Sequence, residues 1–155
     1  MTPADGVLEI TVRRRTENGW PVVAEGYRAG TLLPVRYEGL LRLDSEPAVS
    51  SPREYGKALG EALFQGKIRE AFIRARSDQL DGVHLLVSVE AEDLKGWRWQ
   101  WLCAPTDAGD WEFLSLDQRA IFSLYLQSLT SRDYKPITQR DLRVLLLVAN
   151  PADPE

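Results

Sequence analysis

The 155 residues of this chain suit one domain, long enough to bury roughly two thirds of the surface that its unfolded form exposes. The composition, 44% hydrophobic and 27% charged, excludes a disordered or fibrous chain, and the formal net charge of -4 argues against a general nucleic-acid binder. The single cysteine cannot form an intramolecular disulfide, which fits a reducing compartment.

The N-terminal sequence MTPADGVLEI lacks the basic start and long apolar core of a signal peptide. No apolar run approaches the roughly 18 residues of a membrane span. The sequence therefore predicts a cytoplasmic protein with no membrane partner. One histidine and one cysteine leave no zinc cluster, and no glycine-rich phosphate loop is present, so we expect no metal or cofactor.

Residues 1–45 have the pattern of an antiparallel β-meander. The stretches GVLEITVRRR and WPVVAEGY flank an Asn-Gly pair at 18–19 that favours a tight hairpin turn, and VRYEGLLRLD supplies a third strand. The basic run at 13–15 falls in this hairpin, which we expect at the edge of the sheet. We interpret the run as a solvated face that discourages strand aggregation.

After residue 50 the spacing of apolar residues changes from that of a strand to that of a helix, which predicts two helices. Ser51, Pro52 and Glu54 form a helix start with a hydroxyl cap, a proline in the first turn and an acid that can close a capping box. Gln65-Gly66 interrupts the pattern, so we expect two helices packed across the sheet. The apolar faces comprise Tyr55, Leu59, Ala62 and Leu63 in the first helix and Ile68, Ala71, Phe72 and Ala75 in the second.

The second half of the chain returns to strands. Residues 83–89 alternate in polarity, with Val83, Leu85, Val87 and Val89 on one predicted face. After a tryptophan-rich piece, WEFLSL and AIFSLYLQSL predict two apolar elements, the second ambiguous between helix and strand. A linker-like stretch leads to the apolar run Val144–Ala149, which is typical of a strand buried on both faces of a largely parallel sheet.

These elements predict an α+β fold. A β-rich N-terminal meander and a helical pair would pack on a mixed sheet within a single domain, 1–155. Its parts are the β-rich residues 1–45, the helix pair and β elements of 51–130, and the closing strand at 142–149.

Cys103 and His84 are the one nucleophile and base worth pairing, and a cysteine peptidase needs them close in space. Two residues alone are a weak signal. A satisfied or solvent-facing histidine on a strand and a buried, inert thiol among aromatic residues are the favoured interpretations. We therefore assign no catalytic residue.

Trp97, Trp99 and Trp101 alternate with Arg98 and Gln100. As a strand they would form a stacking platform for single-stranded nucleic acid or a glycan; as core they would pack against the helices. The acidic pI near 5.1 and the scarcity of nearby basic residues favour packing. The acids of the same half are interpreted as solvated loop residues because none stands in a dyad motif; they are Glu90, Glu92, Asp93, Asp107 and Asp110.

Four segments together resemble, in order and spacing, the region that opens the CHAT-type peptidases, which are caspase-like cysteine proteases related to separase. They are YGKALGEALFQGKIREAFIRAR, VSVEAEDLKGWRWQWLCAP, WEFLSLDQRAIFSLYL and LRVLLLVANP. Residues 59–64 match the helix LGEALF of the family closely. The family's pattern of leucine, Trp-Glu, two apolar residues and a proline-ended turn falls on Leu94, Trp99, Gln100, Trp101, Leu102 and Pro105. Gln100 replaces the usual acid, Arg98 the usual proline and Ala104 the usual aspartate.

The resemblance spans roughly residues 50–155, and it implies that LRVLLLVANP is the first strand of a caspase-like sheet. In the family the catalytic histidine and cysteine lie on later strands of that sheet. His84 and Cys103 precede it, so neither matches a catalytic position.

The first hypothesis is therefore an N-terminal, non-catalytic scaffold or regulatory part of a CHAT-type protease, of the kind found in bacterial defence and signalling proteins. Its partner would be the catalytic C-terminal half or another protein chain, and the last strand could mediate self-association. The alternative is a stand-alone intracellular binding or adaptor domain. A small hydrolase that uses Cys103 is a distant third.

Overall fold

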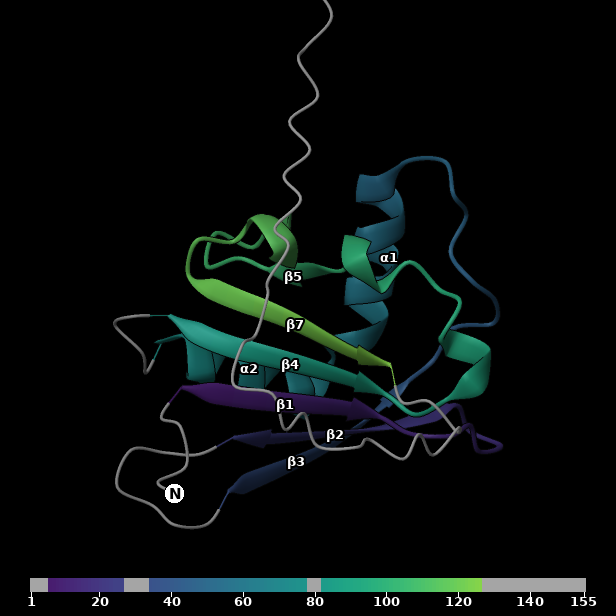
Figure 1. Ribbon diagram of the computed structural model, residues 1–155, viewed down its shortest axis with the longest axis horizontal. Coiled ribbons are helices and arrows are strands. Elements are labelled where there is room, and N and C mark those ends of the chain that lie inside the picture. The colour runs from purple at the N-terminus through teal and green to yellow at the C-terminus, as the bar shows by residue number, and fades with distance from the viewer. Residues whose placement is uncertain (1–5, 27–33, 78–81, 127–155) are drawn as a thin grey trace, which may run out of the picture.

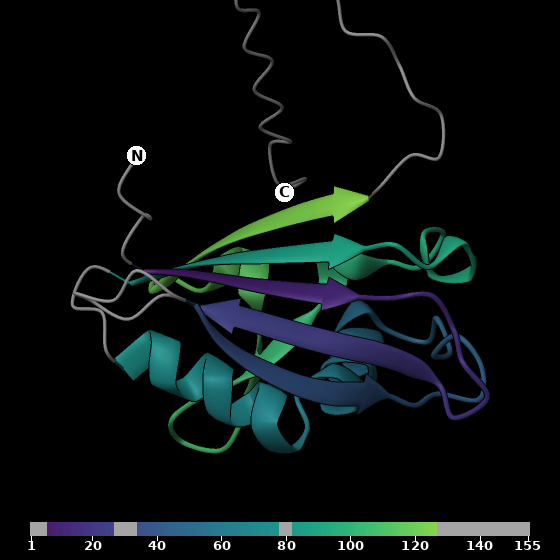
Figure 2. The same ribbon diagram turned by 90° about the horizontal axis from the view of Figure 1, so that it is seen from below.

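Five strands form one mixed sheet, and two helices pack on one of its faces (Figures 1 and 2). The computed structural model describes residues 6–26, 34–77 and 82–126 and confirms the α+β class. The sheet order is β3-β2-β1-β4-β7. Its strands are β1 Val7–Val12, β2 Trp20–Gly26, β3 Val35–Leu41, β4 Val83–Val89 and β7 Ala120–Leu126.

The predicted antiparallel meander is confirmed, because β1 pairs with β2 and β2 with β3 in antiparallel registers. The placement of its first hairpin at the sheet edge is wrong. β4 pairs in parallel with the other side of β1, with Leu8 opposite Leu85, so β1 is the central strand. The basic run at 13–15 remains exposed, and the Arg15 guanidinium lies 4.7 Å from the centre of the Trp20 ring.

Both predicted helices are present, α1 Pro52–Leu63 and α2 Gly66–Ser77. The Ser51 hydroxyl accepts a hydrogen bond from the Glu54 amide at 3.1 Å, which confirms the cap. Phe64 and Gln65 separate the helices, and Gly66 begins α2 with a φ of +48°, a backbone conformation that side-chain-bearing residues adopt rarely. The expected apolar stripes are buried, except that Ala75 is only partly so.

The core lies between the helices and one face of the sheet. Alternation along the strands directs their apolar side chains to this face. The buried members on the three central strands are Leu8, Ile10, Val12, Trp20, Val22, Ala24, Val83, Leu85, Val87 and Val89. We call the opposite face, on which neither α1 nor α2 packs, the open face.

The tryptophan-rich segment forms turns of 3₁₀ helix, η1 Glu92–Leu94 and η2 Trp99–Trp101. A two-stranded antiparallel hairpin follows, β5 Cys103–Pro105 with β6 Trp111–Phe113, and packs on α1. A third such turn, η3 Leu114–Leu116, leads into β7, which resolves the ambiguous element as a strand.

The predicted closing strand at 142–149 lies outside the described residues. Among the described residues, neither helix has the length or the apolar character needed to cross a membrane.

Candidate functional site

Cys103 lies in β5 against α1, on the helix-covered side of the sheet. The residue is completely buried, and its thiol lies 3.6 Å from the Trp101 carbonyl oxygen, to which it can donate. Burial raises the pKa of the Cys103 thiol to about 11, because the nearby Arg53 charge offsets only part of the effect of burial. A nucleophilic cysteine needs the opposite environment, one that stabilises the thiolate.

His84 lies on the open face of the sheet, because its β4 neighbours Val83 and Leu85 are buried on the helix-covered face. The sheet therefore separates the imidazole from Cys103. His84 Nε2 and Ser123 Oγ are 2.8 Å apart, in hydrogen-bond contact between β4 and β7. The interpretation of Cys103 as a buried thiol and His84 as a locally satisfied histidine agrees with this geometry.

The contact between His84 and Ser123 was not anticipated from the sequence. A serine hydroxyl beside an imidazole is the geometry that activates a serine nucleophile, provided that a third group orients the base. Among the described residues no hydrogen bond to His84 Nδ1 is seen. Only the parallel register of β4 with β7 brings the two residues together, and nothing in their sequence spacing indicates that register.

The tryptophan segment is not a stacking platform. Trp99 is fully buried, and its indole Nε1 donates to the Leu94 carbonyl at 2.7 Å. Trp97 and Trp101 are half-buried and pack edge-on against Trp20 and Tyr55, with ring centres 6.0 and 5.5 Å apart. The interpretation of these tryptophans as packing residues is therefore confirmed. The contact of Trp101 with Tyr55 holds η2 against α1.

Three of the five acidic residues named from the sequence, Glu92, Asp93 and Asp107, make side-chain contacts that hold neighbouring segments together. Asp93 accepts from Trp20 Nε1 at 3.1 Å, and Asp107 pairs with Arg119 at 3.4 Å. Glu92 pairs with Lys95, and the backbone amide of Asp110 donates to the Thr106 hydroxyl. In the described ranges no group of three or more His, Cys, Asp or Glu residues could hold a metal ion.

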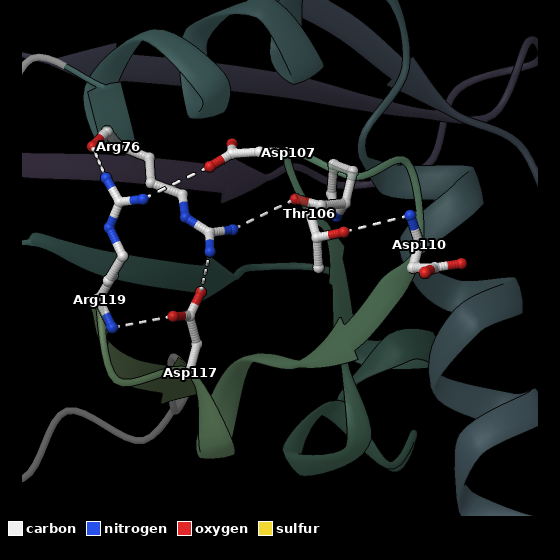
Figure 3. A network of polar contacts seen from close by, with 7 residues as sticks. Arg76, Thr106, Asp107, Asp110, Asp117 and Arg119 are labelled. Carbon is white, nitrogen blue, oxygen red and sulfur yellow. Dashed lines mark hydrogen bonds and ion pairs between the residues drawn. The ribbon is translucent and has the colours of Figure 1, made fainter.

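A polar network joins the end of α2, the β5–β6 hairpin and the loop before β7 (Figure 3). Arg76 Nη2 lies 3.4 Å from Asp117 Oδ2, and Arg76 Nη1 donates to the Pro105 carbonyl at 3.4 Å. Arg119 adds a bond from Nη2 to the Arg76 carbonyl. The Arg76 Nε is buried and has no hydrogen-bond partner among the residues that the structure describes, so these residues satisfy the guanidinium only in part. The network ties three segments together.

A groove of about 320 Å³ lies between the first turn of α1 and the β6–η3 segment. Three apolar side chains, one cation and one acid line it: Trp111, Phe113, Leu116, Arg53 and Glu112. Leu116 is 75% exposed. A second hollow of about 440 Å³, between β3 and α2, is lined mainly by mixed charges.

No model of a known protein family, no curated protein and no solved structure matches this chain.

Proposed function

We propose that this chain is the N-terminal, non-catalytic scaffold part of a cytoplasmic CHAT-type, caspase-like cysteine protease. The observation that carries the proposal is the contact between parts of the first three segments on which the resemblance rests, the ones that fall mainly among the described residues. The helix that contains LGEALF packs against η2, β5 and β6, so those segments form one body around α1. A hypothetical Cβ at Gly56 or Gly60 would collide with the carbonyl oxygen of Trp101 or Cys103. Such close packing explains why these segments would occur together.

The environments of Cys103 and His84 support a non-catalytic role for this part. The only cysteine and the only histidine lie on opposite sides of the sheet, and burial raises the pKa of the thiol to about 11. Peptide hydrolysis would then depend on residues supplied by the partner half. The chain would contribute a rigid surface on which that half folds and is held.

The activity of the protein encoded by the complete reading frame tests this proposal. We expect peptidase activity on fluorogenic peptides that survives Cys103→Ser and His84→Ala within about twofold. Replacing a cysteine located after residue 155 should abolish it. Activity that requires Cys103, or a reading frame with no further histidine and cysteine, would overturn the proposal.

A stand-alone binding or adaptor domain is the second candidate, and one observation favours it. The described residues already enclose a core: Tyr55, Leu59, Phe72, Leu85 and Trp99 are completely buried. A domain of this kind can fold without a catalytic half. A reading frame that stops after Glu155, together with a monomeric chain that melts cooperatively, would favour this candidate.

A further inference from the structure

Strand β7 forms an edge of the sheet that lacks the usual protection. β4 pairs with one side of β7, and no strand among the described residues pairs with the other. The strand AIFSLYL contains no charged residue. Ile121 and Tyr125 are 69% and 55% exposed on the open face. An uncharged, apolar edge of seven residues favours the addition of another strand.

The opposite edge, β3, shows the contrast. Arg36 pairs with Glu25 and Glu38 at 3.8 and 3.2 Å, and the Glu38 side chain is 72% exposed. Charged side chains on an edge strand oppose pairing with a further chain, because pairing would bury them. Charged side chains therefore oppose the addition of a strand at β3, whereas the β7 strand itself carries no charged side chain that would do so.

The direction of β7 sets the requirement for the next strand. β7 runs parallel to β4, and β4 parallel to β1. A further parallel strand in the same chain needs a connection of about a dozen residues or more. Fifteen residues, 127–141, separate β7 from Leu142. Fully extended they reach about 50 Å, whereas a seven-residue strand is only about 23 Å long.

We propose that residues 142–149 of the same chain pair in parallel with the free edge of β7 as a sixth strand. Val144–Ala149 is apolar at every position, so both faces of the strand would be apolar over these six residues, which follow Arg143. Both faces of β7 have matching side chains, with Ile121 and Tyr125 on the open face and the half-buried Phe122 and Leu124 on the other.

A second copy of the chain is the weaker candidate for this edge. A tethered strand acts at an effective concentration of the order of millimolar, far above that of a second chain at micromolar concentration. The proposed pairing concerns the sheet alone and does not depend on the proposed link to a protease. It can be correct whether or not the longer protein hydrolyses peptides.

Disulfide cross-linking in the full chain tests the pairing. Tyr125→Cys places a thiol on the open face, and single cysteines are introduced in turn at positions 144–149. Neighbouring strands bring Cα atoms within the range that a disulfide can bridge. We expect intramolecular cross-links at every second position, several-fold above the intervening ones. With Leu124→Cys as the matched variant, the favoured positions should switch to the intervening set, because Leu124 lies on the other face.

Cross-links between chains would overturn the proposal in favour of a second copy, and cross-links without alternation would overturn it altogether. Hydrogen exchange supplies an independent measurement. Leu146→Pro should speed exchange of the β7 amides that do not bond to β4, while β1 amides stay protected. Ala152→Pro, outside the proposed strand, is the control. If those β7 amides exchange equally fast in the wild type and in a folded Leu146→Pro variant, the pairing is contradicted. If the variant does not fold, the alternation of the cross-links alone tests the pairing.

Discussion

Arg76 and Asp117 form an ion pair between the last turn of α2 and the loop that precedes β7, with Nη2 and Oδ2 3.4 Å apart. Their side chains are only 10% and 9% exposed. Because Asp117 lies three residues before β7, the pair helps to hold the start of the edge strand against the helix layer. A buried guanidinium in this position needs its counter-charge.

Asp117→Asn should lower the free energy of unfolding by about 3 kcal/mol, because it leaves the buried Arg76 charge uncompensated. Urea denaturation at pH 7 measures the change. Asp107→Asn is the matched control, since the Arg119–Asp107 pair is 52% and 67% exposed and should contribute at most about 1 kcal/mol. Equal losses in the two variants would show that burial of the Arg76–Asp117 pair is unimportant.

The double variant Arg76→Met/Asp117→Leu should recover most of the stability that Asp117→Asn loses. Apolar residues of similar volume remove both desolvated charges, together with the buried Arg76 Nε that none of the described residues partners, and such replacements are often neutral or stabilising. The same urea titration provides the measurement. A double variant less stable than Asp117→Asn alone would mean that the network determines the position of the loop by its hydrogen bonds.

Local signals in the sequence predicted most of the individual elements. The cap at Ser51, the break at Gly66 and the alternation of 83–89 each depend on neighbouring residues, and all three are confirmed. The pairing of strands that lie far apart in the sequence was harder to predict. The hairpin of β1 was expected at the edge because nothing near it indicates that β4, some seventy residues later, pairs with its other side.

The same limit applies to the candidate site. Cys103 and His84 could be weighed by residue type, and the inert interpretation agrees with their burial and contacts. The contacts of His84 with Ser123 and of Arg76 with Asp117 join residues about forty positions apart. Both contacts follow from the register of the strands and from the way α2 packs on the sheet. Neither can be recognised from the types of residue along the sequence.

Gly60→Ala should destabilise the protein by about 2 kcal/mol. Alanine favours a helix over glycine by about 1 kcal/mol, but its Cβ would collide with the Cys103 carbonyl oxygen, and overpacking of this kind costs up to about 3 kcal/mol. Thermal or urea unfolding measures the result. Gly96→Ala, where a Cβ would meet no atom within 4 Å, should change stability little. A stabilised Gly60→Ala variant would show that β5 can move away from α1.

The Cys103 thiol should react very slowly with a disulfide reagent at pH 8 in the native protein. With its pKa raised to about 11 by burial, about one thiol in a thousand is ionised at that pH, and none of its surface is exposed. In denaturing urea the same thiol should react stoichiometrically, which provides the internal control. Rapid native labelling would contradict the buried position of β5 and reopen the question of a reactive cysteine.

The phenol of Tyr55 should make stability fall at alkaline pH. Tyr55 is fully buried; its hydroxyl donates to Glu46 Oε1 at 2.7 Å and accepts from the Arg98 amide at 3.0 Å. Burial, reinforced by the Glu46 carboxylate, raises the pKa of Tyr55 from 10.0 to about 12. The folded state therefore favours the neutral phenol. This contribution is complete below about pH 10 and is lost as the pH rises toward 12.

Urea titrations between pH 7 and 11.5 measure this contribution as the difference between the wild type and Tyr55→Phe. At pH 7 the variant should be less stable by about 1 kcal/mol, because Glu46 and the Arg98 amide lose their partner. Above pH 10 the difference should shrink, because only the wild type has a buried phenol to ionise. Cys103 titrates in both proteins and cancels in the comparison. A constant difference across this range would mean that the Tyr55 phenol ionises as readily in the folded protein as in the unfolded chain.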